Sequence, residues 1–419
     1  MIYVVVGSGP AGVVAAERLR KLDPLANISL IGAEPEPPYS RMAIPYYLTD
    51  KIQENGTYLR KTAMHFEKLD IDLVQKTVTS IDTEFNRLIT DDESVRRYDK
   101  LLLATGASPV VPPVPGIDSP GVHNCWTLED ARHIVKLAKP GASVVLMGAG
   151  FIGCIILESL ALRDVNLTVV EMENRMVPRM MNDVSGNMIK SWCEKKGVAV
   201  HTSTRAESIE QLGGGKLRVS LSTGQSVDAD LVISATGVAP NMGFLAESGL
   251  HTDQGIVVND YLQTSDADIY AAGDVCQGKD FNTGEYTVQA IQPTAVEHAK
   301  VAASNMVRGH RSEHVGNLNM NVLDTIGLVS ASFGMWMGVP GGDSSELVNE
   351  SEHKYLSLQF KDDVLVGASS LGLTQHVGVL RGLIQSETRL GPWKERLKKD
   401  PMRIMEAYLA CSQSQVTAA

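Results

Sequence analysis

The sequence predicts an α/β protein, because one strand–turn–helix pattern occurs twice along the chain. In the first copy, residues 2–6 form an apolar run typical of a buried strand, and a glycine-rich turn follows at once. The second copy begins at Ser143 and keeps the same order. A third apolar run, residues 269–272, also ends in a glycine. Strands that alternate with helices in this way favour parallel sheets covered by helices.

The first turn carries three glycines in the spacing G-x-G-x-x-G, and residues 13–22 then follow a helical pattern. In this arrangement the first glycine permits a tight turn, the second lets the backbone approach a pyrophosphate, and the third lets the helix pack on the strand. The helix start directs unpaired N–H groups at the anion. The alternative is a turn that binds no ligand. The candidate binding residues are Gly7, Gly9, Pro10, Ala11 and Gly12.

An acidic residue stands where an adenosine ribose is expected. The next apolar run, residues 28–31, ends near Glu34. A carboxylate at that distance from the glycines accepts hydrogen bonds from ribose hydroxyls. Glu34 is therefore a candidate nucleotide-binding residue.

The second copy repeats every part of the first. Strands at 143–147 and 167–170 flank a helix at 151–162, and the second of these strands ends at Glu171. A carboxylate there accepts from a free ribose 2′-hydroxyl and repels a 2′-phosphate, so the sequence predicts NAD rather than NADP. Arg175, which follows closely, weakens this preference slightly. Two such folds predict two dinucleotides, one held tightly and one exchanging. The candidate residues of the second turn are Gly148, Gly150, Ile152 and Gly153.

Each copy also contains a later strand that ends in the tripeptide Ala-Thr-Gly. The first tripeptide includes Thr105 and Gly106, and the second ends at Gly237. A glycine in such a turn lets the backbone approach a ligand. The third strand-and-glycine motif ends in Asp274, whose carboxylate suits a sugar-alcohol hydroxyl. The alternative for Asp274 is a helix N-cap.

Between and after these motifs the pattern changes. Residues 71–90 alternate as short antiparallel strands do, and a proline cluster after residue 108 marks a domain boundary. The last hundred residues hold no third glycine fingerprint, and we interpret them as a separate α+β domain for dimer or partner contacts. Its predicted strands are 319–328, 354–360 and 364–371, and its predicted helices are 376–386 and 401–409.

Composition limits the classes of function. A chain of 419 residues is long enough for two or three domains. A net charge of −11 with only 5% aromatic residues argues against a nucleic-acid partner. We see neither a signal peptide nor an apolar stretch of membrane-spanning length, so we expect a cytoplasmic protein. The five cysteines are scattered without a CxxC pair, which argues against disulfides and against a metal site.

Taken in order, the segments GSGPAG, ATG, GAGFIG, ATGVAPN and AAGD make the sequence resemble the FAD-dependent pyridine nucleotide–disulfide oxidoreductase superfamily. The resemblance covers nearly the whole chain and is strongest to the NADH oxidase, nitrite reductase and ferredoxin or rubredoxin reductase branch. It implies two Rossmann-like three-layer domains, with the FAD domain interrupted by the NAD domain, and a C-terminal α+β interface domain. The implied boundaries are 1–114 and 245–314 for the FAD domain, 115–244 for the NAD domain and 315–419 for the interface domain.

The resemblance also assigns roles to residues. FAD would bind the first glycine turn and NADH the second. Glu34 and Asp274 would bind ribose and ribityl hydroxyls of FAD, and Val78 would contribute backbone contacts to adenine. Arg41 and Thr105 would lie near FAD, although the alternative for Arg41 is a solvated loop arginine.

The sequence departs from this family at the positions that carry thiol chemistry. Disulfide reductases have a CxxxxC early in the chain, but no cysteine precedes Cys125 here. Single-cysteine relatives carry a cysteine where this chain has Met42, and a thioether cannot become a thiolate nucleophile. Many relatives have a glutamate where this chain has Ile155. No catalytic residue is assigned, and the candidates for positions beside the flavin are Met42, Tyr46 and Glu158.

What remains is electron transfer without a protein nucleophile. The leading hypothesis is an NADH-preferring FAD flavoprotein that exchanges electrons with an iron–sulfur partner. That partner is a ferredoxin or rubredoxin, or a subunit of a larger enzyme such as a tungsten aldehyde oxidoreductase. We expect this chain to form a homodimer or a hetero-oligomer through its C-terminal domain. The alternatives are a stand-alone NADH oxidase or an enzyme like the reductases of CoA disulfide or peroxide. A further alternative is a non-catalytic nucleotide-binding subunit.

Overall fold

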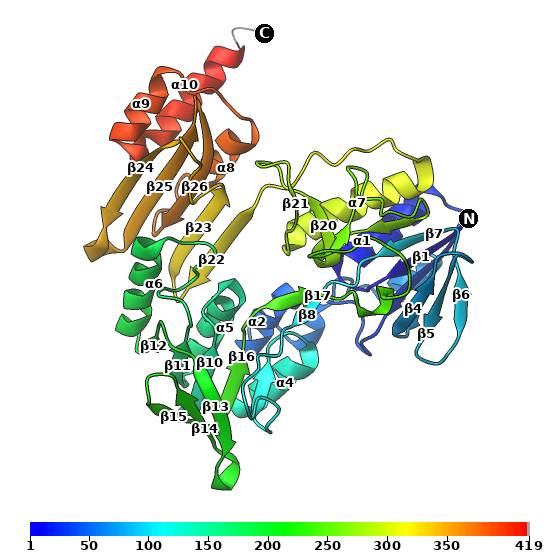
Figure 1. The fold of residues 1–419 in the computed structure, drawn as a ribbon, viewed down its shortest axis with the longest axis horizontal. Coiled ribbons are helices and arrows are strands. Elements are labelled where there is room, and N and C mark those ends of the chain that lie inside the picture. Colours follow the sequence, from blue (N-terminus) through cyan, green and yellow to red (C-terminus); the bar gives the residue numbers. More distant parts are fainter. Residues whose placement is uncertain (417–419) are drawn as a thin grey trace. The chain divides into compact units, whose positions relative to one another are not determined.

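The computed structural model describes the backbone of residues 1–416 and the side chains of residues 1–411. The chain divides into two compact units, each assembled from two separate stretches (Figure 1). The first unit comprises residues 1–108 and 238–317. The second comprises residues 109–237 and the chain from residue 318 onward. The α/β class with parallel sheets is confirmed, while the domain boundaries given above stay predictions.

A five-stranded parallel sheet forms the centre of the first unit. Its middle strand is the apolar run Ile2–Val6, in which only Ile2 is exposed. Helices α1 (Pro10–Leu22) and α7 (Gln292–Arg308) pack against each other in this unit. In spatial order the strands are β19 (Ile269–Ala271), β7 (Lys100–Leu103), β1 (Ile2–Val6), β2 (Asn27–Gly32) and β3 (Ile71–Gln75).

The expectation of antiparallel strands over residues 71–90 is wrong for the first of them. Strand β3 pairs in parallel with β2 and forms the edge of the main sheet. The connection between β2 and β3 is long enough for the crossover that a parallel pair needs. An alternating sequence pattern predicts which side chains share a face of a strand. It does not predict whether that strand pairs in parallel or antiparallel with its neighbour. The antiparallel expectation is confirmed for the rest, in the sheet of β4 (Val78–Asp82), β5 (Arg87–Thr90) and β6 (Val95–Arg97).

The second unit contains its own five-stranded parallel sheet. Residues 143–147 and 231–234 are strands there, as the sequence predicts. In spatial order the strands are β12 (Ala199–His201), β11 (Asn166–Val170), β10 (Ser143–Met147), β16 (Leu231–Ser234) and β9 (Val122–Asn124). The helices are α4 (Leu128–Leu137), α5 (Phe151–Ala161) and α6 (Asp183–Lys195).

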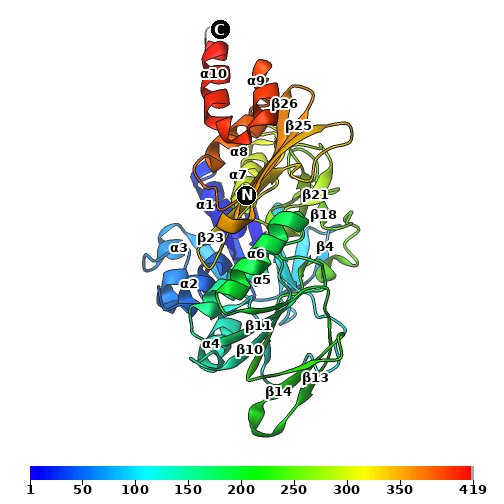
Figure 2. The same cartoon turned by 90° about the vertical axis from the view of Figure 1, so that its left-hand side faces the viewer.

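The C-terminal part of the second unit contains an antiparallel five-stranded sheet. Helix α8 packs on β23 and β26, and α9 packs on β24, as Figures 1 and 2 show. The spatial order is β22 (Met320–Thr325), β23 (Leu328–Gly334), β26 (Val364–Leu371), β25 (Lys354–Lys361) and β24 (Asp343–Asn349). The helices are α8 (Val377–Gln385), α9 (Pro392–Lys399) and α10 (Ile404–Val416).

Two C-terminal elements differ from their predicted bounds. The single strand expected over 319–328 is two strands, because Ile326 and Gly327 both have positive φ and turn the chain. The helix expected from residue 401 begins as a short 3₁₀ turn, and α10 starts at Ile404.

Smaller elements complete the two units. Within the described residues, none of the helices combines the length and apolar character that crossing a membrane requires. The remaining helices are α2 (Ile44–Leu48) and α3 (His65–Lys68). The remaining strands are β8 (Ala107–Pro109), β13 (Ala206–Gln211), β14 (Leu217–Leu221), β15 (Ser226–Ala229), β17 (Val238–Pro240), β18 (Ile256–Val257), β20 (Cys276–Lys279) and β21 (Tyr286–Val288).

Candidate functional site

The first glycine turn leaves no room for side chains where strand and helix meet. Gly7 has φ +110°, and a Cβ built there would lie 2.0 Å from the carbonyl oxygen of Ala104. A Cβ at Gly12 would lie 1.8 Å from the Gly7 oxygen. Gly9 is different, because its Cβ would meet nothing within 4 Å. The backbone at Gly9 therefore borders open space, as the approach of a pyrophosphate requires.

The N-terminus of α1 faces this open space without a side-chain cap. Gly9 is its N-cap, Pro10 is its first residue, and no acidic residue lies in its first turn. Unpaired N–H groups and the positive end of the helix dipole favour an anion at such a position. The turn therefore fits the pyrophosphate of a dinucleotide.

The Asp274 motif lies beside this turn. A Cβ at Gly273 would be 3.3 Å from Cβ of Ala11 on α1 and 3.4 Å from Cβ of Ala295 on α7. Burial raises the pKa of Asp274, and the charge of Arg41 acts in the opposite direction. The structure thus brings together two motifs that are far apart in the sequence.

Glu34 belongs to a network of three side chains at the end of β2. Its carboxylate accepts hydrogen bonds from the Tyr39 hydroxyl at 2.5 Å and from Arg41 Nη2 at 2.6 Å. Arg41 also donates to the Tyr39 hydroxyl at 2.8 Å. The side chains of Glu34 and Arg41 are 32% and 35% exposed. Arg41 is therefore an ion-paired residue of this loop.

The first Ala-Thr-Gly turn is tied to a residue after the second. The Thr105 hydroxyl donates to the Asn241 carbonyl at 3.0 Å, and Asn241 Nδ2 donates to the Thr105 carbonyl at 2.9 Å. Gly106 and Gly237 both have positive φ, at +67° and +120°. Thr105 therefore has a structural partner in addition to its predicted place near FAD. Val78 begins β4 and is buried, so only its backbone is suited to a ligand contact.

The second glycine turn repeats the backbone geometry of the first. Gly148 has φ +99°, and its Cβ would lie 2.5 Å from the Ala235 oxygen. A Cβ at Gly153 would lie 2.2 Å from the Gly148 oxygen, while one at Gly150 would meet nothing within 4 Å. Helix α5 again begins without a side-chain cap, and Ile152 is in its first turn. This turn also fits a pyrophosphate.

Glu171 is held by the backbone of the second turn itself. It is only 7% exposed, and its carboxylate accepts from the Ala149 N–H at 2.6 Å and from the Glu173 N–H at 2.9 Å. A carboxylate has about four lone-pair positions, so capacity remains for a ribose hydroxyl. Glu171 therefore fixes the shape of the loop and keeps a negative charge next to it.

Arg175 binds neighbouring groups of its own loop and of the start of α6. Its Nη1 donates to Asp183 at 2.7 Å, and its Nε donates to the Met181 carbonyl at 2.8 Å. Its Nη2 donates to the Pro178 carbonyl at 3.2 Å. The guanidinium is thus bound on three of its donor atoms.

The cysteines are not poised for thiolate chemistry. Burial raises the pKa of Cys125 and of Cys193 to about 12. It also raises the pKa of every other cysteine above its usual range, namely Cys154, Cys276 and Cys411. Met42 and Tyr46, by contrast, are 48% and 54% exposed, and Glu158 is half-buried on α5.

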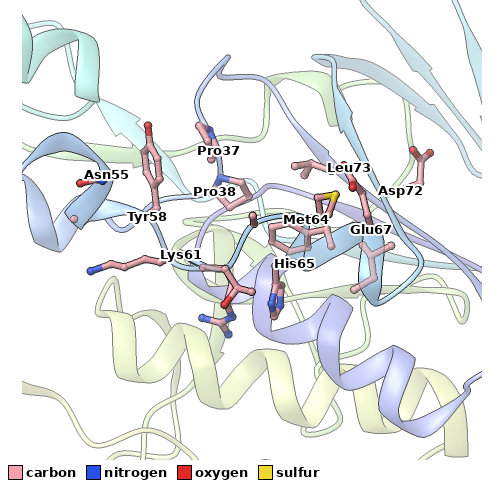
Figure 3. Close-up of a pocket in the computed structure, with 16 residues that line it drawn as sticks. Pro37, Pro38, Asn55, Tyr58, Lys61, Met64, His65, Glu67, Asp72 and Leu73 are labelled. Atoms are coloured by element: carbon pink, nitrogen blue, oxygen red, sulfur yellow. The ribbon is translucent and has the colours of Figure 1, made fainter.

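A surface cavity of about 720 Å³ in the first unit is not the predicted FAD site. Three parts of the chain line it, as Figure 3 shows: the loop of Pro37 and Pro38, the start of α3 and the edge strand β3. Arg60 and His65 line it, and both bind Glu17 of α1 at 2.6 and 2.8 Å. It includes neither a residue of the glycine turn nor Glu34, so no cofactor is assigned to it.

Three residues of these sites were not singled out from the sequence. They are Tyr39, Asn241 and Ala149, which bind Glu34, Thr105 and Glu171 respectively. Tyr39 lies between Glu34 and Arg41 in the sequence, and Asn241 closely follows Gly237, so proximity to a motif is the only available signal for these two. Ala149 acts through its backbone, which side-chain identity does not reveal.

Comparison with known proteins gives a consistent family. A family model described as pyridine nucleotide-disulphide oxidoreductase matches residues 1–305. The epsilon subunit of the NADH-dependent phenylglyoxylate dehydrogenase of Aromatoleum evansii is 29% identical over 96% of this chain and 96% of its own. The NADH oxidase of Methanocaldococcus jannaschii is 34% identical over 73% of this chain and 70% of its own.

Solved structures agree over most of the chain. A NAD-dependent persulfide reductase from A. fulgidus is 28% identical with a TM-score of 0.85, and the match covers 94% of this chain and 78% of that one. A ferredoxin reductase from Rhodopseudomonas palustris is 26% identical with a TM-score of 0.81, over 88% of this chain and 91% of that one.

Proposed function

We propose that this chain, which belongs to the pyridine nucleotide-disulphide oxidoreductase family, passes electrons between NAD(H) and an iron–sulfur redox partner. Its cofactors are FAD and NAD(H), and it is an NAD(H)-dependent flavin oxidoreductase. When bound, FAD accepts a hydride equivalent from NADH and can release electrons one at a time. The residues of this chain supply binding, orientation and electrostatics.

The first unit would hold FAD. The open backbone at Gly9 and the uncapped start of α1 would meet the pyrophosphate. Glu34, fixed by Tyr39 and Arg41, would accept from the adenosine ribose, and Asp274 would accept from the ribityl chain. The raised pKa of Asp274 suits a carboxylate that gains hydrogen-bond donors only when a ligand is present.

The second unit would hold NADH. The open backbone at Gly150 and the uncapped start of α5 repeat the anion site. Glu171 would accept from the ribose 2′-hydroxyl, and its buried charge would repel a 2′-phosphate. Because Arg175 is bound elsewhere, no cation there compensates that repulsion. NADH is therefore the preferred donor.

The state of the cysteines supports an electron acceptor on another protein. Met42 stands where the family resemblance implies a redox cysteine, and burial raises the pKa of all five cysteines of the chain. Thiolate is the reactive form of cysteine, so electrons have no thiol route out of the flavin. Among the residues that the structure describes, no group of His, Cys, Asp and Glu can hold a metal ion. The iron–sulfur centre would therefore belong to another protein.

The similarity along the full length to a dehydrogenase subunit supports a second element of the proposal. We infer that the chain works as the flavin subunit of a larger oxidoreductase, or as a reductase that meets a small ferredoxin or rubredoxin. A likeness to a ferredoxin reductase supports the same class of partner.

A panel of acceptors tests this proposal. The purified FAD-loaded protein is given NADH with an oxidised ferredoxin, with oxygen alone, or with coenzyme A disulfide. The iron–sulfur acceptor should give the fastest NADH oxidation, and treatment with iodoacetamide or the substitution Cys125→Ser should leave that rate unchanged. Full turnover with oxygen alone would instead identify an NADH oxidase. Thiol release from coenzyme A disulfide would identify a disulfide reductase and contradict the role given to Met42.

A further inference from the structure

A polar surface cavity in the second unit belongs to neither dinucleotide site. It has a volume of about 420 Å³, within the usual range for small-molecule sites. It lies between the start of α6 and the face of the C-terminal sheet that points away from α9. It shares no residue with the second glycine turn and does not include Glu171. Among the residues that line it are Arg175, Asp183, Trp336, Glu346, Ser357 and Ser369.

The floor of the cavity is a row of polar side chains across neighbouring strands. Glu346 on β24 is directly opposite Ser357 on β25, and Ser357 is directly opposite Ser369 on β26. Directly opposite residues share one face of a sheet. The two serines are 5% and 2% exposed, so their hydroxyls are buried at the base of the cavity. The opposite face is the one that packs on the helices, since Ser345 there donates to the Leu397 carbonyl of α9.

One of these two serine hydroxyls has no hydrogen-bond partner in the part of the protein that the structure describes. Ser357 Oγ accepts from Gln359 Nε2 at 2.8 Å. Ser369, which is 98% buried, makes no side-chain hydrogen bond to any residue that the structure describes. A hydroxyl in such a place that has no protein partner usually faces a ligand or water. Ser369 is one of the residues that line the cavity.

The remaining groups make the cavity rich in acceptors. Oε1 of Glu346 accepts from the Tyr355 hydroxyl and from Asn182 Nδ2, which fixes the carboxylate. Its Oε2 has no partner among the described side chains. The only cation in the lining is Arg175, which binds Asp183 and two backbone carbonyls. An occupant must therefore bring donors and positive charge.

We propose that this cavity binds a primary ammonium group on an aliphatic stem. The ammonium has three donors, and Glu346 Oε2 with the hydroxyls of Ser357 and Ser369 offers three acceptors on one row. Trp336, which is 8% exposed, provides an apolar wall for the stem and an aromatic ring for the cation. This site does not depend on the proposed electron-transfer function.

The ammonium has two chemical sources, a free alkylamine or the lysine side chain of another protein. Putrescine represents the first source, and Nα-acetyl-lysine methylamide represents the second. 1,4-Butanediol has the same stem as putrescine without charge and serves as the ligand control.

Isothermal titration of the FAD-loaded full chain tests the site. Putrescine should bind saturably, and butanediol should not. Glu346→Gln should weaken binding about 10-fold or more, because a charged hydrogen bond is lost. Ser369→Ala should weaken it about 2- to 10-fold while keeping the fold, so the test survives if Glu346→Gln alters packing through Tyr355. Glu350→Gln, an exposed carboxylate outside the cavity, should change nothing.

The source follows from the two probes. Tighter binding of putrescine supports a free amine, and tighter binding of the lysine mimic supports a lysine side chain. Absence of saturable binding by both probes overturns the proposal. So does binding that is equal in the native chain, in Glu346→Gln and in Ser369→Ala.

Discussion

The two glycine turns of this molecule have the same backbone but hold their acidic residues differently. In both turns the first glycine has positive φ, and a Cβ added to it would clash with a carbonyl of the neighbouring Ala-Thr-Gly turn. Glu34 is about one-third exposed and is held by side chains of a loop, whereas Glu171 is 7% exposed and is held by N–H groups of its own turn. Steric limits on the backbone thus dictate the glycine geometry that the two turns share. The groups around each acidic residue set what that turn can bind.

The difference predicts that the two turns bind different ligands, and that they hold them differently. The first turn has a second carboxylate nearby, Asp274, and the Glu34–Arg41–Tyr39 network, so several side chains are placed to contact one ligand. The second turn offers a rigid and buried charge. We infer a tightly held FAD at the first turn and an exchanging NADH at the second.

The largest loss of stability should come from adding a side chain at the first glycine of either turn, because both positions share the same steric limits. Gly7→Ala puts a Cβ 2.0 Å from the Ala104 oxygen at φ +110°, and Gly148→Ala puts one 2.5 Å from the Ala235 oxygen at φ +99°. Strain at positive φ and overpacking together should lower the free energy of unfolding by about 2–5 kcal/mol in each case. Urea unfolding of the FAD-depleted proteins measures this. Equal stability of either variant and the native chain would show that the turn tolerates a side chain.

The middle glycines provide the matched control. A Cβ at Gly9 or Gly150 meets nothing within 4 Å, so alanine there should cost about 1 kcal/mol or less, as for a changed N-cap. The added methyl group borders the space of the pyrophosphate. Gly9→Ala should therefore lower FAD retention on a desalting column, and Gly150→Ala should raise KM for NADH with FAD retained.

The next effect should separate the two carboxylates. Glu171→Gln removes the buried charge and should raise KM for NADH about 10- to 100-fold, the equivalent of one charged hydrogen bond. Its preference for NADH over NADPH should fall as well. Glu34→Gln should leave KM for NADH unchanged and weaken FAD retention. Initial-rate kinetics on FAD-saturated protein would contradict this assignment if the two variants exchanged behaviour.

A smaller, pH-dependent effect should mark Asp274. Burial raises its pKa, so between the unfolded and folded pKa values the folded state binds more protons and ionisation opposes folding. In FAD-depleted protein, Asp274→Asn should therefore be more stable than the native chain at neutral pH. This gain should shrink as pH falls towards about 4, where aspartate protonates even when unfolded. Thermal melts across pH test this, and a gain that grows at low pH would contradict the sign.

The smallest effect should come from Arg175. Because its donors already bind Asp183 and backbone carbonyls, Arg175→Ala should change KM for NADPH less than about 2-fold, within the noise of a lost surface pair. A rise in KM for NADPH alone would show that Arg175 does reach a 2′-phosphate.

Local features could be predicted from the sequence, and long-range ones could not. Residues 2–6 and 143–147 are strands before a glycine turn because apolar runs and glycine spacing act within a few residues. The direction of β3 depends on its pairing with β2, which the alternation of residues 71–90 does not encode. The C-terminal strand expected over 319–328 was split by a turn at Ile326, a residue without turn propensity.

The candidate sites show the same limit. The spacing placed Glu34 and Glu171 at the ends of their strands, and both lie there. It did not reveal that Arg41 pairs with Glu34, since a proline-rich loop has no periodic pattern from which to predict it. It also did not reveal the Ala149 N–H that holds Glu171, because a backbone donor is the same for every residue type.

The central claim is that electrons enter from NADH and leave to an iron–sulfur partner without a thiol. Anaerobic stopped-flow spectroscopy tests it most directly. Mixing the FAD-loaded protein with NADH should bleach the flavin absorbance, and a second mixing with oxidised ferredoxin should restore it at least as fast as steady-state turnover. Recovery at the full turnover rate with oxygen alone, and none with the iron–sulfur protein, would contradict the account.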